Sequence, residues 1–285
     1  MNVKPPTTIN EQIDILESRG CVIGNREFVY QILNKINYYR LTAYFLPFKK
    51  YNDSYIDNLT FEKVYNIYEF DRKVRSVIFP VIEEIEIMVR LKFAYHHAHK
   101  YGSLGYSDSS NFNNHHNHIQ FENHIKRAVK NNDKQLFVKH HIEKYNNKFP
   151  IWVVIELFSM GELSIFYSDM CISDKKILAK EMYDVTHYHL SSWLICLTYF
   201  RNYCTHYSRF YYNTFPAIPK TPKNSSYEFS KSLFDYILLL KFLYNDIGNW
   251  NAELFIPLQA LIENYSDDIN LSHINFPDNW IDLLK

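Results

Sequence analysis

The spacing of apolar and polar residues predicts helices along almost the whole chain. Apolar residues recur every three or four positions, and no segment alternates convincingly between apolar and polar residues as a β-strand would. The longest helical pattern runs from residue 61 to about residue 99. We expect Pro80 to kink or split this helix, because proline lacks a backbone donor and clashes with the preceding turn. The other predicted helices lie at residues 9–19, 26–36, 119–131, 134–146, 150–170, 187–212, 227–246 and 251–264.

Local signals mark the ends of several of these helices. Thr8 and Glu11 have the spacing of a capping box, and Gly20 is placed to end the first helix. Thr60 is expected to cap the long helix, directly after the polar segment KKYNDSYIDNLT (49–60). A second polar segment, YGSLGYSDSSNFNNHHNH (101–118), is predicted to be a loop.

The same pattern divides the chain into three parts. We expect an N-terminal helical segment at residues 1–55, a helical core at 56–215 and a C-terminal helical extension at 216–285. The proline-rich stretch PAIPKTPKNSS (216–226) would connect the last two parts. The predicted fold class is therefore all-α, with additional helices on either side of a central bundle.

Composition and charge exclude some functions. The chain has 285 residues but only six glycines, and it contains neither G-x-G-x-x-G nor G-x-x-x-x-G-K-[ST], which excludes a Walker-type NTPase. Lys and Arg total 31, as do Asp and Glu, and a net charge of zero counts against wholesale coating of nucleic acid. The N-terminus lacks an apolar leader, and no uncharged apolar run could span a membrane. We expect a cytoplasmic protein with no membrane partner and with reduced cysteines.

The most informative stretch is YFRNYCTHYSRFYY (199–212). It places Arg201, Asn202 and His206 in an otherwise aromatic segment. Metal-free cleavage of RNA needs a base for the 2′-hydroxyl, an acid for the leaving 5′-oxygen and a cation for the phosphorane. Histidine suits either proton role, and arginine offers a charged fork that matches phosphate. Asn202 could orient a phosphate oxygen or the histidine.

The spacing by itself leaves three interpretations open. The pair could be catalytic, or it could bind phosphate without cutting, as in an RNA-binding or RNA-sensing module. It could also pack structurally in an all-α partner protein, and a fully buried His206 bonded to backbone would then be expected. A chain with 13 histidines will contain some Arg–His pairs by chance.

Four blocks in matching order resemble a known family. RNYCTHYSR (201–209) resembles the R-N-x-x-x-H signature of HEPN domains, especially those of AbiD/AbiF-type abortive-infection proteins of bacteria. NYYRLTAYFLPF (37–48), EEIEIMVRLKFAYHHA (83–98) and PIWVVIELFSMGELSIFY (150–167) are similar to the other conserved blocks of that family. Together the blocks cover roughly residues 10–212, and nothing beyond about residue 216 is recognised.

The resemblance implies a function and a site. It implies a HEPN-type helical bundle that acts as an endoribonuclease in defence against phage, without metal or other cofactor, and that is related to the HEPN nucleases of RNA-guided CRISPR effectors. Arg201, Asn202 and His206 would form its catalytic site, which a homodimer would complete. Such an enzyme would be the toxin of an abortive-infection or toxin–antitoxin system, and a noncoding RNA could hold it inactive. The RNA target and the trigger are not specified by the sequence.

Other residues are candidates for supporting roles. Glu86, Arg90 and His97 would fall within about 40° on one face of a straight helix. Glu86 could then hold Arg90, and Arg90 and His97 could extend a phosphate-binding surface; the alternative is a solvated Glu–Arg pair. Glu156, in an otherwise apolar segment, could bond Arg201 or Arg90, or it could face water.

Several basic residues are candidates for RNA contacts. Basic residues cluster at RKVR (72–75), and Lys126, Lys130 and Lys134 recur every four positions, which would form a stripe for phosphates or a solvated helix face. Arg40 lies in an aromatic block, while Arg209 remains undecided. The histidines at 115, 116, 118 and 124 match no metal-binding spacing, so we predict a flexible surface loop and no metal site.

Overall fold

The computed structural model describes residues 5–222, 225, 227–244 and 246–285, and the fold is all-α, as predicted. No strand occurs among these residues, which form only three isolated β-bridges. The helices begin with α1 (Ile9–Ser18), α2 (Arg26–Leu33), α3 (Tyr38–Thr42), α4 (Phe61–Tyr101), α5 (His118–Asn131), α6 (Leu136–Tyr145) and α7 (Ile151–Val154). They continue with α8 (Met160–Asp169), α9 (Ile172–Tyr183), α10 (His187–Thr205), α11 (Leu233–Leu243), α12 (Ile247–Trp250), α13 (Ile256–Asn264) and α14 (Trp280–Leu284).

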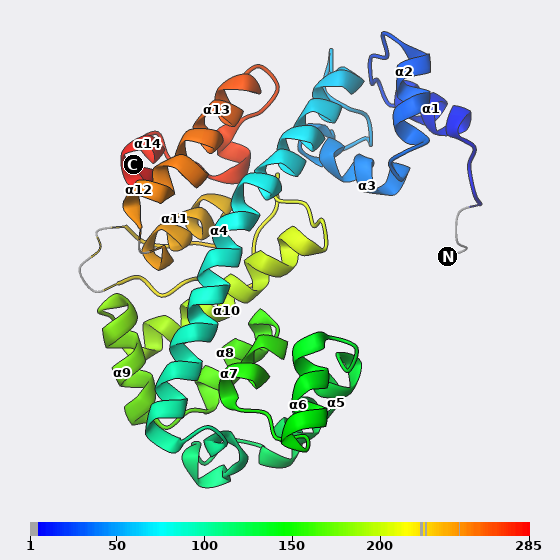
Figure 1. The fold of residues 1–285 in the computed structure, drawn as a ribbon. Helices are drawn as coiled ribbons and strands as arrows, with labels where there is room; N and C mark the ends of the chain where they lie inside the picture. The colour runs from blue at the N-terminus through cyan, green and yellow to red at the C-terminus, as the bar shows by residue number, and fades with distance from the viewer. Residues whose placement is uncertain (1–4, 223–224, 226, 245) are drawn as a thin grey trace.

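Helix α4 is the spine of the molecule and crosses it from end to end (Figure 1). Its N-terminus is capped by Thr60, whose hydroxyl accepts from Lys63 N at 3.2 Å, and Gly102 ends it with a φ of 84°. Apolar side chains at helical spacing are buried along its length, so that α4 packs against α7, α8, α9, α10, α11 and α13.

The N-terminal and C-terminal helices gather at the same half of α4. Figure 1 shows α1–α3 at one side of its N-terminal end and α11–α14 at the other, while α5–α9 surround its C-terminal half. The C-terminal helix α11 also packs against α10. The division at residues 55 and 215 stays a prediction, because these contacts do not define domain boundaries.

The predicted break at Pro80 is wrong in one respect: the helix is not split there. The α-helix continues from Phe61 to Tyr101 with Pro80 inside it. Pro80 is exposed, whereas Ile78, Val81 and Ile82 around it are fully buried. Packing of those neighbours stabilises the helix on both sides of the lost hydrogen bond, and solvent can reach the proline itself.

The structure also divides one predicted helix and adds one that was not predicted. The segment 150–170 is not one helix, because α7 and a 3-10 turn (Ile155–Leu157) end before Ser159, which caps α8 through a box with Glu162. Helix α9 was not predicted at all. The capping box of Thr8 and Glu11 is confirmed, and Gly20 follows the first helix with a φ of 90°. Within the predicted connector, residues 223, 224 and 226 lie outside the described residues.

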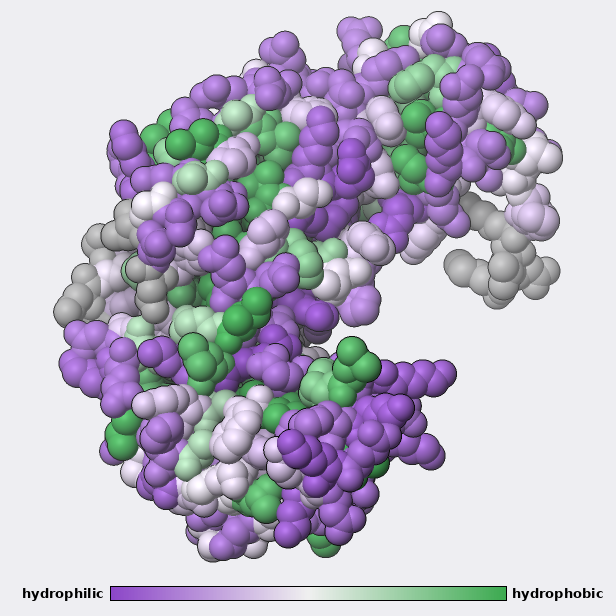
Figure 2. Space-filling model, viewed as in Figure 1, coloured by the Kyte–Doolittle hydropathy of each residue, from purple (hydrophilic) through white to green (hydrophobic). Residues whose placement is uncertain are grey.

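The molecule curves around a hollow. Figure 2 shows this hollow between the N-terminal helices and the α5–α6 region, with mostly hydrophilic residues on its surface. The C-terminal end of α10 borders it in the same view (Figure 1). Among the described helices, none is both long and apolar enough to cross a membrane.

Candidate functional site

The Arg–His segment lies at the C-terminal end of α10, and the helix ends within the motif. We predicted a helix through residue 212, but α10 stops at Thr205 and His206 is its C-cap. Tyr207 adopts the left-handed conformation with a φ of 56°. Its N–H donates to Cys204 O at 3.3 Å, and Ser208 N donates to Tyr203 O at 2.9 Å, which is the Schellman pattern. His206 is therefore exposed on a turn and does not lie on a continuing helical face.

Arg201 is held from α4 by a carboxylate. Its Nε lies 3.6 Å from Oε2 of Glu86, and its Nη1 donates to Thr205 Oγ1 at 3.5 Å. The same carboxylate accepts from Arg90 at 2.5 Å through Oε1, and Arg90 also donates to Phe158 O at 2.6 Å. Buried Arg201 Nε makes no hydrogen bond, because 3.6 Å is too long for one. The guanidinium is therefore positioned by Glu86, and Thr205 is its one hydrogen-bond partner among the described residues, while its side chain stays 31% exposed.

The turn after His206 is fastened by charged groups distant in sequence. Asp71 is 1% exposed, and its Oδ1 accepts from Phe210 N at 3.0 Å and Tyr211 N at 2.7 Å. Its Oδ2 accepts from Tyr44 at 2.7 Å and pairs with Arg75, which in turn donates to Ser208 O at 2.9 Å.

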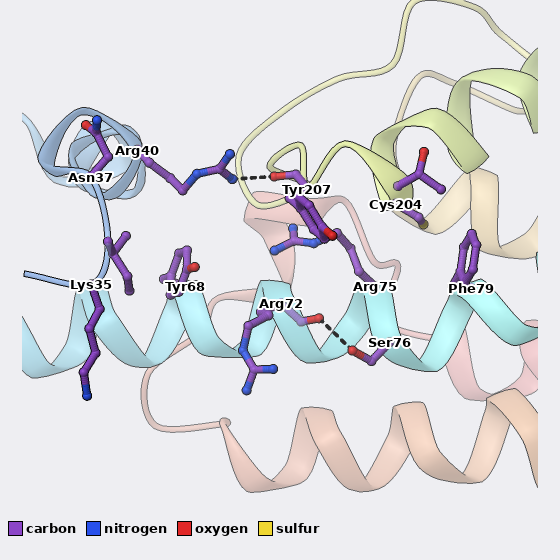
Figure 3. A pocket seen from close by; sticks show the side chains of 12 residues that line it. Lys35, Asn37, Arg40, Tyr68, Arg72, Arg75, Ser76, Phe79, Cys204 and Tyr207 are labelled. Atoms are coloured by element: carbon purple, nitrogen blue, oxygen red, sulfur yellow. Dashed lines mark hydrogen bonds between the residues drawn. The ribbon is translucent and has the colours of Figure 1, made fainter. Parts of the chain in front are cut away.

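Two further arginines tie this turn to the N-terminal helices. Arg40 of α3 donates to Tyr207 O at 2.7 Å, as Figure 3 shows. Arg209 donates to Ala43 O and lies over the Tyr44 ring at 5.9 Å from its centroid. The role of Arg209, which the sequence left open, is therefore to hold the turn. Arg40 also holds the turn through its hydrogen bond, but its side chain is exposed as well.

A cleft of about 690 Å³ opens beside this turn. It lies between α3, α4 and the end of α10, and Thr205 and Tyr207, the two neighbours of His206, are part of its lining. Figure 3 shows Arg40 reaching from α3 toward Tyr207, with α4 running along the cleft. Its cationic lining residues are Lys35, Arg40, Arg72 and Arg75. No carboxylate is among the lining residues that the structure describes.

The motif residues differ in their surroundings. His206 is exposed, Arg201 is about one-third exposed at 31%, and Asn202 is half-buried. The carbonyl of Asn202 accepts from His206 N at 2.9 Å. A fully buried His206, which a purely structural motif would require, is not observed. Burial raises the pKa of the Cys204 thiol to about 12, so this cysteine is a protonated packing residue and not a nucleophile.

Glu156 and His97 do not join the site. Glu156 is exposed and forms no ion pair among the described residues. Glu86, and not Glu156, is the carboxylate that pairs with Arg201. His97 was predicted to extend a phosphate-binding surface, but it is 1% exposed and its ring packs against those of Phe112 and Phe166. The spacing of Glu86, Arg90 and His97 correctly placed them on one face of α4. It could not show that other parts of the structure cover this face at His97.

Burial of His97 predicts a loss of stability in acid. Desolvation lowers the pKa of this imidazole from 6.5 to about 4, so the unfolded chain binds a proton that the folded chain rejects. The contribution of neutral His97 to the free energy of unfolding is fully present above pH 6.5. It is lost as the pH drops toward 4, and the total loss is about 3 kcal/mol. Urea unfolding at pH 7 and pH 4.5 should show a smaller decrease for His97→Leu than for wild type. His115→Leu, at an exposed position, is the control, and equal decreases in wild type and His97→Leu would contradict the prediction.

The histidine-rich segment is packed rather than flexible. His116 stacks on Phe112 at 4.0 Å between centroids, and its Nδ1 lies 2.8 Å from Asp169. His118 bridges His116 and the Ser107 carbonyl, while His124 pairs with Glu162. His115 is exposed. Among the described residues, no group of three or more potential ligands is arranged to hold a metal ion.

Lys126, Lys130 and Lys134 lie far from Arg201 and His206 in the sequence, and only the first two belong to a helix. Lys126 and Lys130 are exposed on α5, but Lys134 lies beyond the end of that helix at Asn131. Lys126 pairs with Glu122 at 3.3 Å. The role of the three lysines in RNA binding stays a prediction. The prediction that they form one continuous stripe on a helix is wrong, because α5 ends before Lys134.

Sequence reasoning did not assign a role to several residues of the cleft. Lys35 and Tyr68 belong to no recognised motif, and Asn37 and Tyr207 lie in recognised blocks but were not singled out, whereas the basic cluster RKVR did contain Arg72 and Arg75. Arg75 points to the turn after His206 because it pairs with Asp71 one helical turn earlier. The i, i+4 spacing of Asp71 and Arg75 was the signal available in the sequence.

Comparison with known proteins adds one finding. A family described as "Abi-like protein" matches residues 31–212. This range contains α4, α10, the cleft and all three motif residues. No curated protein and no solved structure gives a significant match.

Proposed function

The chain belongs to the family of Abi-like proteins, and on that premise we propose that it is a metal-independent endoribonuclease of an abortive-infection system. Family membership suggests a role in defence against phage, and the chemistry is proposed from the site. The observation that carries it is the exposed His206 on a turn, five residues beyond an Arg201 that Glu86 positions and whose side chain stays 31% exposed. The proposed fold of the core is of HEPN type.

The residues have separate roles in this proposal. His206 transfers a proton to or from the reacting oxygens, and the residue is exposed to substrate and solvent. Arg201 binds the phosphate and stabilises the negative charge that develops on it. Asn202, whose carbonyl bonds the backbone of His206, orients the phosphate or the imidazole. Glu86 and Arg90 are positioning residues.

A second copy of the chain would complete the chemistry. One histidine supplies either the base or the acid, and a two-fold pair of α10 ends would bring a second histidine and a second arginine to the same phosphate. We therefore propose a homodimer. A noncoding RNA bound to basic residues such as Lys126, Lys130 and Lys134 would keep such a toxin inactive until infection.

Expression of wild type and of an Arg201→Ala/His206→Ala variant tests this function. We expect the wild type to arrest growth and to cleave total RNA in the presence of EDTA, and the variant to do neither. Equal toxicity of the two proteins would contradict the mechanism, and loss of wild-type cleavage in EDTA would contradict the metal-free chemistry. Tight RNA binding without cleavage at any pH would favour the alternative, a non-catalytic RNA-binding or RNA-sensing HEPN module.

A further inference from the structure

The cleft between α3, α4 and the end of α10 is not used by the three motif residues. Thr205 and Tyr207 belong to its lining, whereas Arg201, Asn202 and His206 do not. The cleft therefore lies immediately beside the proposed reaction centre and is joined to it through the backbone of one turn. Its volume of about 690 Å³ falls within the range of ligand sites, about 300–1,000 Å³.

The charge of the cleft favours an anion of extended shape. Arg75 is neutralised by Asp71, and Arg72 pairs with Glu69 at 2.8 Å while remaining 51% exposed. Lys35 and Arg40 have no carboxylate partner among the described residues, and both are exposed. Lys35 and Arg72 project to the same side of α4 in Figure 3, away from Arg40. Because these cations point to different sides of α4 and do not converge on one point, they fit separate phosphates of a chain better than one compact anion.

Aromatic rings accompany these cations. Tyr207 is 67% exposed, and no ring contact occupies its faces among the described residues. Tyr68, half-buried, also lines the cleft, and its ring is fixed by contacts with Tyr44 at 5.4 Å and Tyr65 at 6.2 Å. Aromatic faces next to a basic track are the usual means of holding unpaired bases. Asn37 also lines the cleft, and because its Oδ1 accepts from Tyr39 N at 2.8 Å as the cap of α3, it offers its amide N–H groups as donors.

We propose that this cleft binds single-stranded RNA and delivers it to His206. Lys35, Arg40 and Arg72 contact the phosphates, and a base stacks on Tyr207. The inference rests on the proposed function for the reaction that follows, but the binding itself does not require catalysis. Stacking on Tyr207 needs an unpaired base, so the site selects single strands over duplexes.

Binding of a fluorescent single-stranded RNA, measured by anisotropy in a His206→Ala background that prevents cleavage, tests the proposal. Lys35→Gln/Arg72→Gln should raise Kd at least tenfold and reduce the salt slope by about 1.4, since each lost phosphate contact contributes about 0.7. Tyr207→Asn should raise Kd about tenfold, because asparagine tolerates the left-handed turn but cannot stack. The matched control, Lys176→Gln/Lys180→Gln on the distant α9, removes the same charge and should leave Kd unchanged (Figure 1).

Three results would overturn the proposal. These are equal affinity of the cleft and control variants at matched urea midpoints, no binding of RNA by any variant, and competition by polyglutamate as strong as by unlabelled RNA of equal charge. The last result would assign the cleft to an acidic protein partner. Cleft-dependent binding together with a wild type that does not cut RNA would refute the ribonuclease and leave this inference standing. Undiminished cleavage by the Lys35→Gln/Arg72→Gln variant with native His206 would refute the role of the cleft and leave the proposed ribonuclease standing.

Discussion

Replacing Asp71 with alanine is expected to lower the free energy of unfolding by about 3–5 kcal/mol. The change removes the acceptor of four donors: Arg75, the Tyr44 hydroxyl and the N–H groups of Phe210 and Tyr211. Arg75 would keep only the Ser208 carbonyl, with a side chain that is 7% exposed, and a buried cation without a counter-ion is costly. Burial raises the pKa of the Asp71 carboxyl, while Arg75, Tyr44 and Tyr211 act against that shift.

Glu69→Ala is a matched control for Asp71→Ala. Glu69 also pairs with an arginine on α4, Arg72, but that arginine is 51% exposed. Its removal should cost less than about 1 kcal/mol, as is usual for pairs in contact with solvent. Urea unfolding followed by circular dichroism measures both changes. If Asp71→Ala unfolds at the same urea concentration as Glu69→Ala, the buried carboxylate does not fasten the turn.

Replacing His206 with alanine is expected to slow RNA cleavage by about 100- to 10,000-fold, the usual contribution of a general acid or base. His206 is exposed, and only its backbone N–H forms a hydrogen bond within the described residues, so the variant should unfold at the wild-type urea concentration. Cleavage of a labelled RNA under single-turnover conditions gives the rate. A loss of rate with unchanged stability separates a chemical role from a packing role.

His115→Ala supplies the comparison for this experiment, because His115 is also exposed and lies outside the motif. It should cleave RNA at the wild-type rate. A His206→Ala protein that cuts within threefold of wild type would show that another group transfers the proton. Cleavage lost equally in both variants would point to damage that is not specific to the motif.

Most of the helices were predictable because capping residues and the spacing of apolar residues within a segment indicate a helix. Thr8 with Glu11 and Thr60 supplied capping groups where the structure has helix starts, and apolar spacing identified the long helix. The failures occurred where packing overrode or interrupted the local pattern. Pro80 did not split α4, because buried neighbours stabilise the helix on both sides. Ser159 with Glu162 was a capping box inside an apolar run, and the run concealed it.

Spacing predicted one pair of the candidate site, whereas the arrangement of the site depends on tertiary packing. The Glu86–Arg90 pair follows from spacing and is present at 2.5 Å, whereas Arg201, Asn202 and His206 were chosen from the family resemblance and stay a prediction. That Glu86 also holds Arg201, while Glu156 faces solvent, depends on how α4 and α10 pack. The same packing buries His97 among aromatic rings, although it shares a helical face with Arg90.

By itself, the sequence determined an all-α chain of the Abi-like family with an Arg–His motif near the end of one helix. Only the tertiary structure decided that this helix stops at Thr205 and turns at Tyr207. Glycine normally supplies a left-handed turn, and none stands there, so no local signal exists. The turn is held instead by Arg40, Asp71 and Arg75, which lie more than a hundred residues away in the chain. Such hydrogen bonds form only once α3, α4 and α10 have packed together, and their packing also creates the basic cleft beside His206.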